Sequence, residues 1–106
     1  MGKDRTIKII ANLIGKTAAH KILVKYTNRP DAINHISSEI DNYRAMLSEY
    51  LIQYNWNSYD RDNIKKESEK SLTKELKQNH FEDVSFPSSE KSKILDETIL
   101  NFFGDS

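Results

Sequence analysis

Apolar residues recur every three or four positions through the middle of the chain, starting just after Pro30. This spacing places them on one face of an α-helix, and it continues for about six turns. The face consists of Ile33, Ile36, Ile40, Tyr43, Leu47, Tyr50, Leu51 and Tyr54. Pro30 suits the first turn of a helix, and Thr27 or Asn28 has a side chain suited to cap its start. The pattern predicts a long amphipathic helix.

The segment before Pro30 also has a helical spacing, although part of it is compatible with a β-strand. Its apolar residues at intervals of three or four are Ile7, Ile10, Ile14, Ala18, Ile22 and Tyr26. Residues 21–27 are β-branched and aromatic enough for a short strand. We favour a helix, because the chain has no second strand of similar quality to pair with this one. In that helix Gly15 costs about 1 kcal/mol relative to Ala.

Two further helices are predicted in the second half of the chain. Residues 60–78 have sparse apolar positions, and Ser68 stands where an apolar residue would continue the helix face. This composition indicates a helix at the rim of the core. The polar residues 55–58 predict the turn that precedes it. Residues 94–104 have a second apolar face at helical spacing, which predicts a terminal amphipathic helix ending at Gly104.

A polar connection is predicted between these two helices, over residues 79–93. Phe81, Val84 and Phe86 alternate within it, as in a short extended segment that packs against the core. Only three glycines and two prolines occur in 106 residues, too few for the turns of a β-sandwich or barrel. We therefore predict a single all-α domain over residues 1–106, built as a small bundle of about four helices.

Composition argues against several classes of protein. The chain has no cysteine, so disulfides, thiolate metal sites and cysteine nucleophiles are excluded, and a cytoplasmic location is the simplest expectation. The longest apolar run, residues 9–14, is interrupted by Asn12 and is far shorter than the roughly 20 residues that cross a membrane. The amino-terminal lysines are too scattered for a helix that lies on a membrane surface. No membrane partner is predicted.

Charge is distributed unevenly, although the formal net charge is zero. Residues 1–29 contain seven of the sixteen basic residues and a single acid, Asp4, so the first segment is basic and the remainder acidic. The basic residues are Lys3, Arg5, Lys8, Lys16, Lys21, Lys25 and Arg29. They are suited to contact phosphates, an acidic partner or the acidic remainder of the chain itself. On a helix, the lysines among them would flank the apolar face rather than form one stripe.

The sequence contains no complete catalytic or cofactor motif. Gly15, Lys16 and Thr17 match the end of a phosphate loop, but Ile10 occupies the position of its first glycine. No G-x-S-x-G motif is present, and adjacent pairs of acids would point in different directions on a helix. We predict neither enzymatic activity nor a cofactor or small-molecule ligand.

Two acidic patterns resemble metal sites without completing them. His35 and Glu39 are four residues apart and share a helix face. They indicate a surface ion pair, because a structural zinc site needs four ligands. A calcium loop starting at Asp60 would need an oxygen ligand and a glycine where Ile64 and Lys65 stand. The acids there suit the start of a helix, and no metal is predicted.

These observations lead to two functional hypotheses. The first is a non-enzymatic protein-binding module that associates with a partner, or with itself as a homo-oligomer, through apolar helix faces and charge polarity. Its predicted docking face consists of Ile94, Leu95, Ile99, Phe102 and Phe103, unless this helix folds back onto its own core. The second is a nonspecific nucleic-acid-binding protein that uses the seven amino-terminal basic residues as phosphate contacts.

Overall fold

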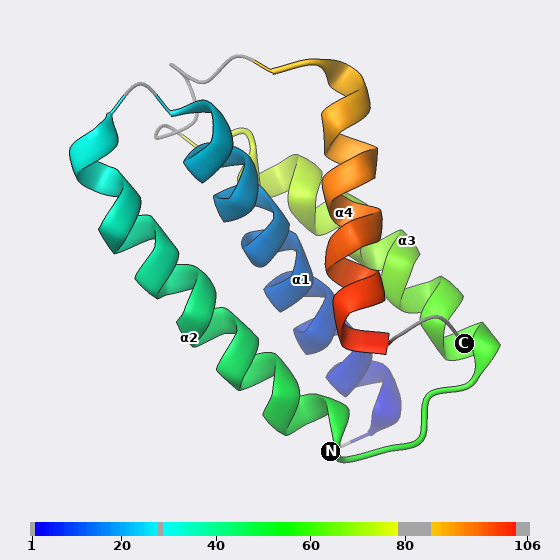
Figure 1. Ribbon diagram of the computed structural model, residues 1–106. Helices are drawn as coiled ribbons and strands as arrows, with labels where there is room; N and C mark the ends of the chain where they lie inside the picture. Colours follow the sequence, from blue (N-terminus) through cyan, green and yellow to red (C-terminus); the bar gives the residue numbers. More distant parts are fainter. Residues whose placement is uncertain (1, 28, 79–85, 104–106) are drawn as a thin grey trace.

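The computed structural model describes residues 2–27, 29–78 and 86–103. Within them the chain forms a 3-10 turn, η1 (Pro30–Ala32), and the α-helices α1 (Lys3–Tyr26), α2 (Ile33–Leu51), α3 (Ser58–Glu75) and α4 (Ser88–Phe103), as Figure 1 shows. No β-strand occurs in these residues. The predicted small all-α bundle is confirmed.

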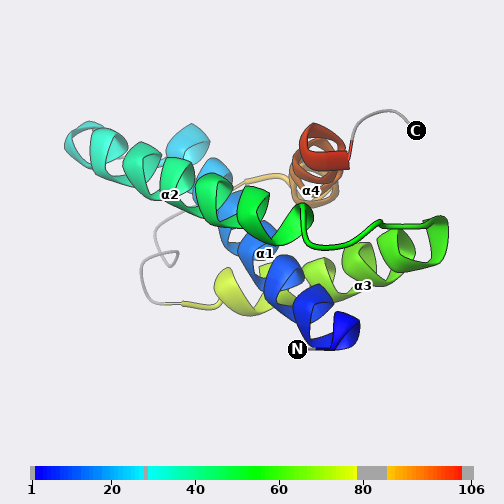
Figure 2. The same ribbon diagram turned by 90° about the horizontal axis from the view of Figure 1, so that it is seen from below.

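Helix α1 is the centre of the bundle, and α2, α3 and α4 pack on different sides of it (Figure 2). The three outer helices contact one another much less than they contact α1. The sequence of α1 explains this position, because apolar and small residues occur on nearly all of its sides. Ile10, Ile14 and Ile22 are completely buried, as are Ala18 and Ala19. A helix of this composition needs other helices to cover it.

Residues 21–27, for which the spacing favours a helix over a strand, are helical as far as Tyr26. Thr27 is the C-cap, and its N–H donates to the carbonyl of Leu23 at 2.8 Å. Ile22 and Leu23 are buried among the outer helices. Burial in this setting outweighs the β propensity of the segment, which depends strongly on its packing surroundings.

Helix α2 confirms the predicted amphipathic helix after Pro30, with differences at both ends. Pro30 belongs to the 3-10 turn rather than to the α-helix, and Tyr54 lies beyond the last residue of α2. Ile36 and Leu47 are buried, whereas the other apolar residues of the face are only partly covered. Helix α2 therefore covers one side of α1 and leaves most of its own surface in water.

No side chain in the described part of the chain caps the start of α2. Ala32 occupies the N-cap position, and its methyl group cannot accept a hydrogen bond. The Thr27 hydroxyl, predicted as a cap, instead accepts the N–H of Arg29 at 3.1 Å. Asn28, the other predicted cap, lies outside the described residues.

Helix α3 has a more deeply buried inner face than its sparse apolar pattern predicts. The Asn57 side chain accepts the N–H of Asp60, and the Asp60 carboxylate accepts the N–H of Asn57, which forms a capping box. Ile64, Ser68 and Leu72 are completely buried. This face is part of the core rather than its rim, because α3 approaches α1 closely enough to cover it.

Helix α4 begins at Ser88 rather than at Ile94, so residues 88–93, predicted as part of a polar connection, are helical. Residues 88–93 contain no apolar residue, so the apolar spacing does not predict a helix there. Glu90 nevertheless continues the inner face of the helix, four residues before Ile94 and eight before Thr98, and all three side chains are buried. A carboxylate is tolerated in this position because Lys25 pairs with it.

The predicted extended segment before α4 is described only at its end. Phe81 and Val84 lie outside the described residues, as does Gly104, the predicted end of the last helix. Phe86 is partly buried against the core, and its ring centre lies 6.0 Å from that of Tyr26. Phe86 therefore connects the start of α4 to the end of α1.

Gly15 marks the closest approach of α1 to α3. A β-carbon placed on Gly15 would lie 2.7 Å from Ser71 Cβ and 2.9 Å from the backbone nitrogen of Leu72, and it would also overlap Ser71 Oγ. These separations are shorter than van der Waals contact, and one of the atoms belongs to the backbone of α3. The glycine is therefore required by helix packing, although it weakens α1 as an isolated helix.

We expect Gly15→Ala to destabilise the protein by about 1–3 kcal/mol, because the cost of overpacking exceeds the gain in helix propensity. Urea denaturation followed by circular dichroism measures this change. Gly2→Ala is the matched control, since a β-carbon at Gly2 would meet nothing within 4 Å. An unchanged or raised midpoint for Gly15→Ala would contradict the close contact between α1 and α3.

We expect Ser68→Ala to stabilise the protein by about 1–2 kcal/mol. The Ser68 hydroxyl is completely buried and has no hydrogen-bond partner among the described residues, so it bears a desolvation cost that alanine does not. Alanine is also the better helix former. The control is Ser48→Ala, which removes an exposed hydroxyl that donates to the Arg44 carbonyl. Thermal or urea unfolding should separate the two variants, and a destabilised Ser68→Ala would show that this hydroxyl is satisfied.

Candidate functional site

The seven amino-terminal basic residues, predicted as one contact surface, occupy different environments in the folded chain. Six of them belong to α1, and the exposed Arg29 follows it. Two near the ends of α1 form ion pairs with acids, one is half-buried and three lie on an exposed strip. Positive charge that is contiguous in sequence is thus divided among several surfaces.

Lys3 joins the start of α1 to the start of α3. Its ammonium nitrogen lies 2.6 Å from Asp60 Oδ2 and donates to the carbonyl of Asn55 at 3.0 Å. The same nitrogen lies 5.4 Å from the centre of the Trp56 ring, within cation–π range. The hydrogen bond from Lys3, helped by the backbone N–H of Asn57, holds the pKa of Asp60 below its usual range.

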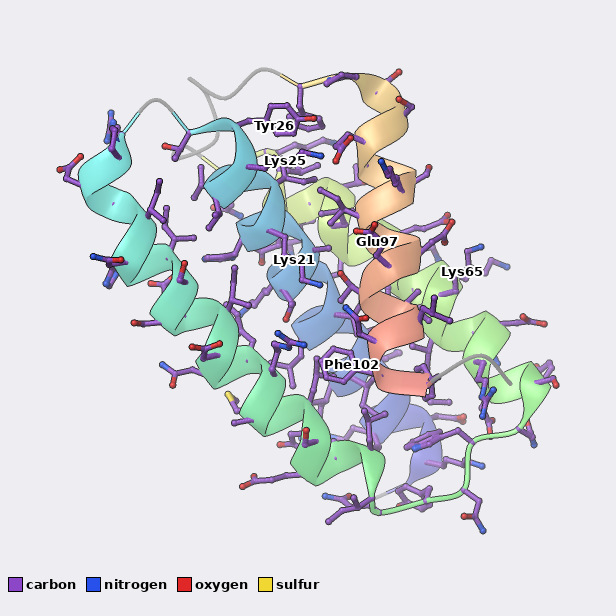
Figure 3. The ribbon with its side chains drawn as sticks, viewed as in Figure 1. Lys21, Lys25, Tyr26, Lys65, Glu97 and Phe102 are labelled. Atoms are coloured by element: carbon purple, nitrogen blue, oxygen red, sulfur yellow. The ribbon has the colours of Figure 1, made fainter. Side chains whose placement is uncertain are left out.

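Lys25 makes a similar link between the end of α1 and the first turns of α4. Its Nζ lies 2.6 Å from Glu90 Oε1. This hydrogen bond raises the pKa of Lys25 and lowers the pKa of Glu90. Figure 3 shows Lys25 and Tyr26 beside the start of α4. The lysines near the two ends of α1 are therefore paired with acids from later segments of the same chain.

Lys21 lies where α1 is seen between α2 and α4 (Figure 3). Its Nζ donates to Thr98 Oγ1 at 3.2 Å, and the Thr98 hydroxyl donates in turn to the carbonyl of Ile94. Burial lowers the pKa of Lys21, the nearby charge of Arg44 lowers it further, and Glu97 opposes both. Lys21 thus connects α1 to α4 instead of presenting its charge on an open surface.

Arg5, Lys8 and Lys16 lie on the remaining side of α1, together with Asn12; these four residues are called the basic strip. At 100° per residue they fall within about 80° of one another, on the side of α1 opposite Lys21. Arg5, Lys8 and Asn12 are exposed, and Lys16 is partly exposed. None of the three cations forms an ion pair with a residue that the structure describes.

The apolar face of α4, predicted as a docking face, is turned toward the core. Ile94 and Leu95 are 5% and 1% exposed. Ile99, Phe102 and Phe103 are partly buried against the same core. The helix is folded back onto its own bundle, which is the alternative considered for this segment. A partner could reach Ile94 and Leu95 only if α4 left α1.

A polar cluster joins α1 to α2, and the sequence indicates only the part of it that lies within α2. His20 Nε2 lies 2.7 Å from one carboxylate oxygen of Glu39, and His35 Nε2 lies 3.0 Å from the other. His20 Nδ1 lies 2.8 Å from the carbonyl of Lys16. Both ring nitrogens of His20 therefore face oxygen atoms, and the imidazolium form donates to both. The predicted pair of His35 with Glu39 is confirmed, while the contact of His20 depends on the packing of the two helices.

The other patterns considered in the sequence have structural roles. Gly15, Lys16 and Thr17 lie within α1, where the Thr17 hydroxyl donates to the carbonyl of Leu13 at 2.8 Å. Asp60 belongs to the capping box of α3. Over the described ranges, no three His, Asp or Glu side chains are placed together so as to hold a metal ion.

No helix within the described residues combines the length and the apolar character needed to span a bilayer. Comparison of the chain with protein-family models, curated proteins and solved structures gives no match. Function must therefore be inferred from the charges and geometry of the molecule. The basic strip is the part of the predicted contact surface that remains available for an external partner.

We expect the bundle to lose stability as the pH falls below about 4.5. The pKa values of Asp60 and Glu90 are lower in the folded chain than their ordinary values. The stability that these carboxylates contribute is complete above their unfolded-state pKa values and is lost as the pH falls through the lowered ones. The double variant Asp60→Asn, Glu90→Gln should lower the urea midpoint at neutral pH and flatten its fall on acidification.

Asp62→Asn with Glu69→Gln is the control for this measurement, because both acids are exposed and neither has an ion pair with a described residue. The control should keep the acid dependence of the unmodified protein. If Asp60→Asn, Glu90→Gln also keeps it, the two ion pairs of α1 do not govern acid stability.

Proposed function

We propose that this protein is a non-enzymatic helical module that binds an acidic helix of another protein through the basic strip. The observation that carries the proposal is the set of three cations on one uncovered side of α1, none of them paired with an acid of the described chain. The apolar faces of the helices are occupied by the core, so charge rather than an apolar groove supplies the recognition.

The spacing of the basic strip supports a helical partner. Arg5, Lys8, Asn12 and Lys16 are separated by three, four and four residues, and the row is about 16 Å long on an α-helix. Acids at the same spacing on a second helix would face these positions one by one. A partner of this kind needs only a short acidic face.

A second copy of the chain is a less suitable partner. The exposed acids of the outer helices include Asp41 and Glu49 on α2 and Asp62 and Glu69 on α3. Within the described residues, none of these helices presents three exposed acids in a row at intervals of three or four. We therefore expect acids at the spacing of the basic strip to come from a different protein.

Nucleic-acid binding through the seven basic residues has less support than protein binding. Lys3 and Lys25 already contact carboxylates, and Lys21 is half-buried. Three free cations would give a slope of about −3 in log affinity against log salt, whereas strong DNA binders make about 6–10 phosphate contacts. The basic strip suits weak, charge-steered association better than a nucleic-acid groove.

We expect an alanine-based helical peptide with glutamates at intervals of three and four to shift the amide signals of Arg5, Lys8 and Lys16 in NMR titrations at about 50 mM salt. The triple variant Arg5→Glu, Lys8→Glu, Lys16→Glu should weaken binding at least about tenfold, because it reverses every cation of the strip. The titration of the unmodified chain and of the variant measures both effects.

The matched control changes the net charge equally by substituting glutamate for three exposed lysines on or just after α3, namely Lys66, Lys74 and Lys77. It should retain peptide binding. Shifts that map elsewhere, or equal losses in both variants, would reject the strip as the binding surface. Tighter binding of a DNA duplex would favour nucleic acid, and a dimer in light scattering that the triple variant dissociates would favour a second copy.

A further inference from the structure

A second basic surface, separate from the basic strip, lies between α3 and α4. Figure 1 shows α3 passing behind α4, and the two helices contact each other at few points. The space between them is an open pocket of about 600 Å³. Lys66 and Lys70 line it from α3, and Lys91 lines it from α4. Three lysines from two helices thus border one open hollow.

Carboxylates of the described chain neutralise this positive charge only in part. Glu69 is the one acid among the residues that line the pocket. Lys91 is partly buried, and its Nζ contacts the hydroxyl of Thr73 rather than a carboxylate. Lys70 is exposed, and its contact with Glu67 is a surface pair at 3.6 Å, which contributes little. Lys66 has no ion pair with a described residue.

The remaining walls of the pocket suit an anion with several charged groups. Thr73 and Ser92 contribute hydroxyl groups, and the buried Leu95 forms an apolar floor. Lysine ammonium groups are compact point charges that bind phosphate well. A volume of this size lies within the range of small-molecule sites. Six of the seven lining residues carry a charged or hydroxyl group, which is appropriate for a highly charged ligand.

We infer that this pocket binds a small polyphosphorylated ligand, with phosphate groups that bridge the lysines of α3 and the lysine of α4. The ligand would add a direct connection between two helices that are otherwise joined mainly through α1. Binding would therefore stabilise the folded bundle. This inference does not depend on the proposed protein partner, because the basic strip contributes no residue to the pocket.

Titration of the full chain with inorganic triphosphate, ATP and adenosine at about 150 mM salt tests the inference. Triphosphate and ATP should both shift amide signals in residues 66–73 and 91–95. Each should also raise the melting temperature by several degrees at about 100 times its dissociation constant. Adenosine should do neither, because it has no phosphate. Adenosine binding equal to that of ATP, or shifts confined to the basic strip, would overturn the inference.

Lys66→Gln with Lys70→Gln should weaken triphosphate binding at least about tenfold. Both side chains are exposed, so the double variant should fold, and circular dichroism verifies that it does. Lys74→Gln with Lys77→Gln is the matched control: it removes two exposed lysines near the end of the same helix, outside the pocket. Unchanged binding in the pocket variant, or an equal loss in the control, would show nonspecific attraction and reject the site.

Discussion

The contact between α1 and α3 at Gly15 is the constraint on which the rest of the structure depends. Without a side chain at this position, the backbone of α3 comes within van der Waals distance of α1. That approach covers Ile64, Ser68 and Leu72 completely, although they form a narrow and partly polar face. A chain of 106 residues has a limited core, so close approach compensates for the few large apolar residues of α3.

The same central position of α1 explains how the charge of the chain is used. A helix surrounded on three sides brings its basic residues against the acidic segments that follow it in sequence. Lys3 and Lys25 therefore contact Asp60 and Glu90 near opposite ends of α1. Because both acids are buried, these pairs position α3 and α4 as well as neutralising charge. Two of the seven amino-terminal basic residues are thus paired with acids of the same chain.

Two groups of basic residues at the surface differ in character. The basic strip lies on one helix and is convex, which suits a complementary helix. The pocket between α3 and α4 combines lysines from two helices around a hollow, which suits a compact anion. Both surfaces occur where an outer helix fails to meet its neighbour. A central helix with three covering helices leaves such gaps, and in this chain lysine and arginine side chains border them.

The apolar periodicity predicts the amphipathic helix after Pro30, because side-chain periodicity is a local property of a helix. The all-α class follows from this periodicity together with the few glycines and prolines, and the polar residues 55–58 predict the turn before α3. The four-residue spacing of His35 and Glu39 also indicates their pair, which lies within one helix. The sequence pattern does not predict the first turns of α4, because Glu90 stands where an apolar residue is expected, and its pairing with Lys25 helps to allow its burial.

Tertiary structure alone decided which candidate residues remain available for a partner. The sequence does not distinguish among the seven amino-terminal basic residues. In the structure, two of them are paired with acids more than 50 positions away in the chain. The apolar face of α4 is equally able to cover its own core or a partner, and folding placed it on α1. Such contacts depend on how helices pack against one another, and no spacing within a single helix encodes them.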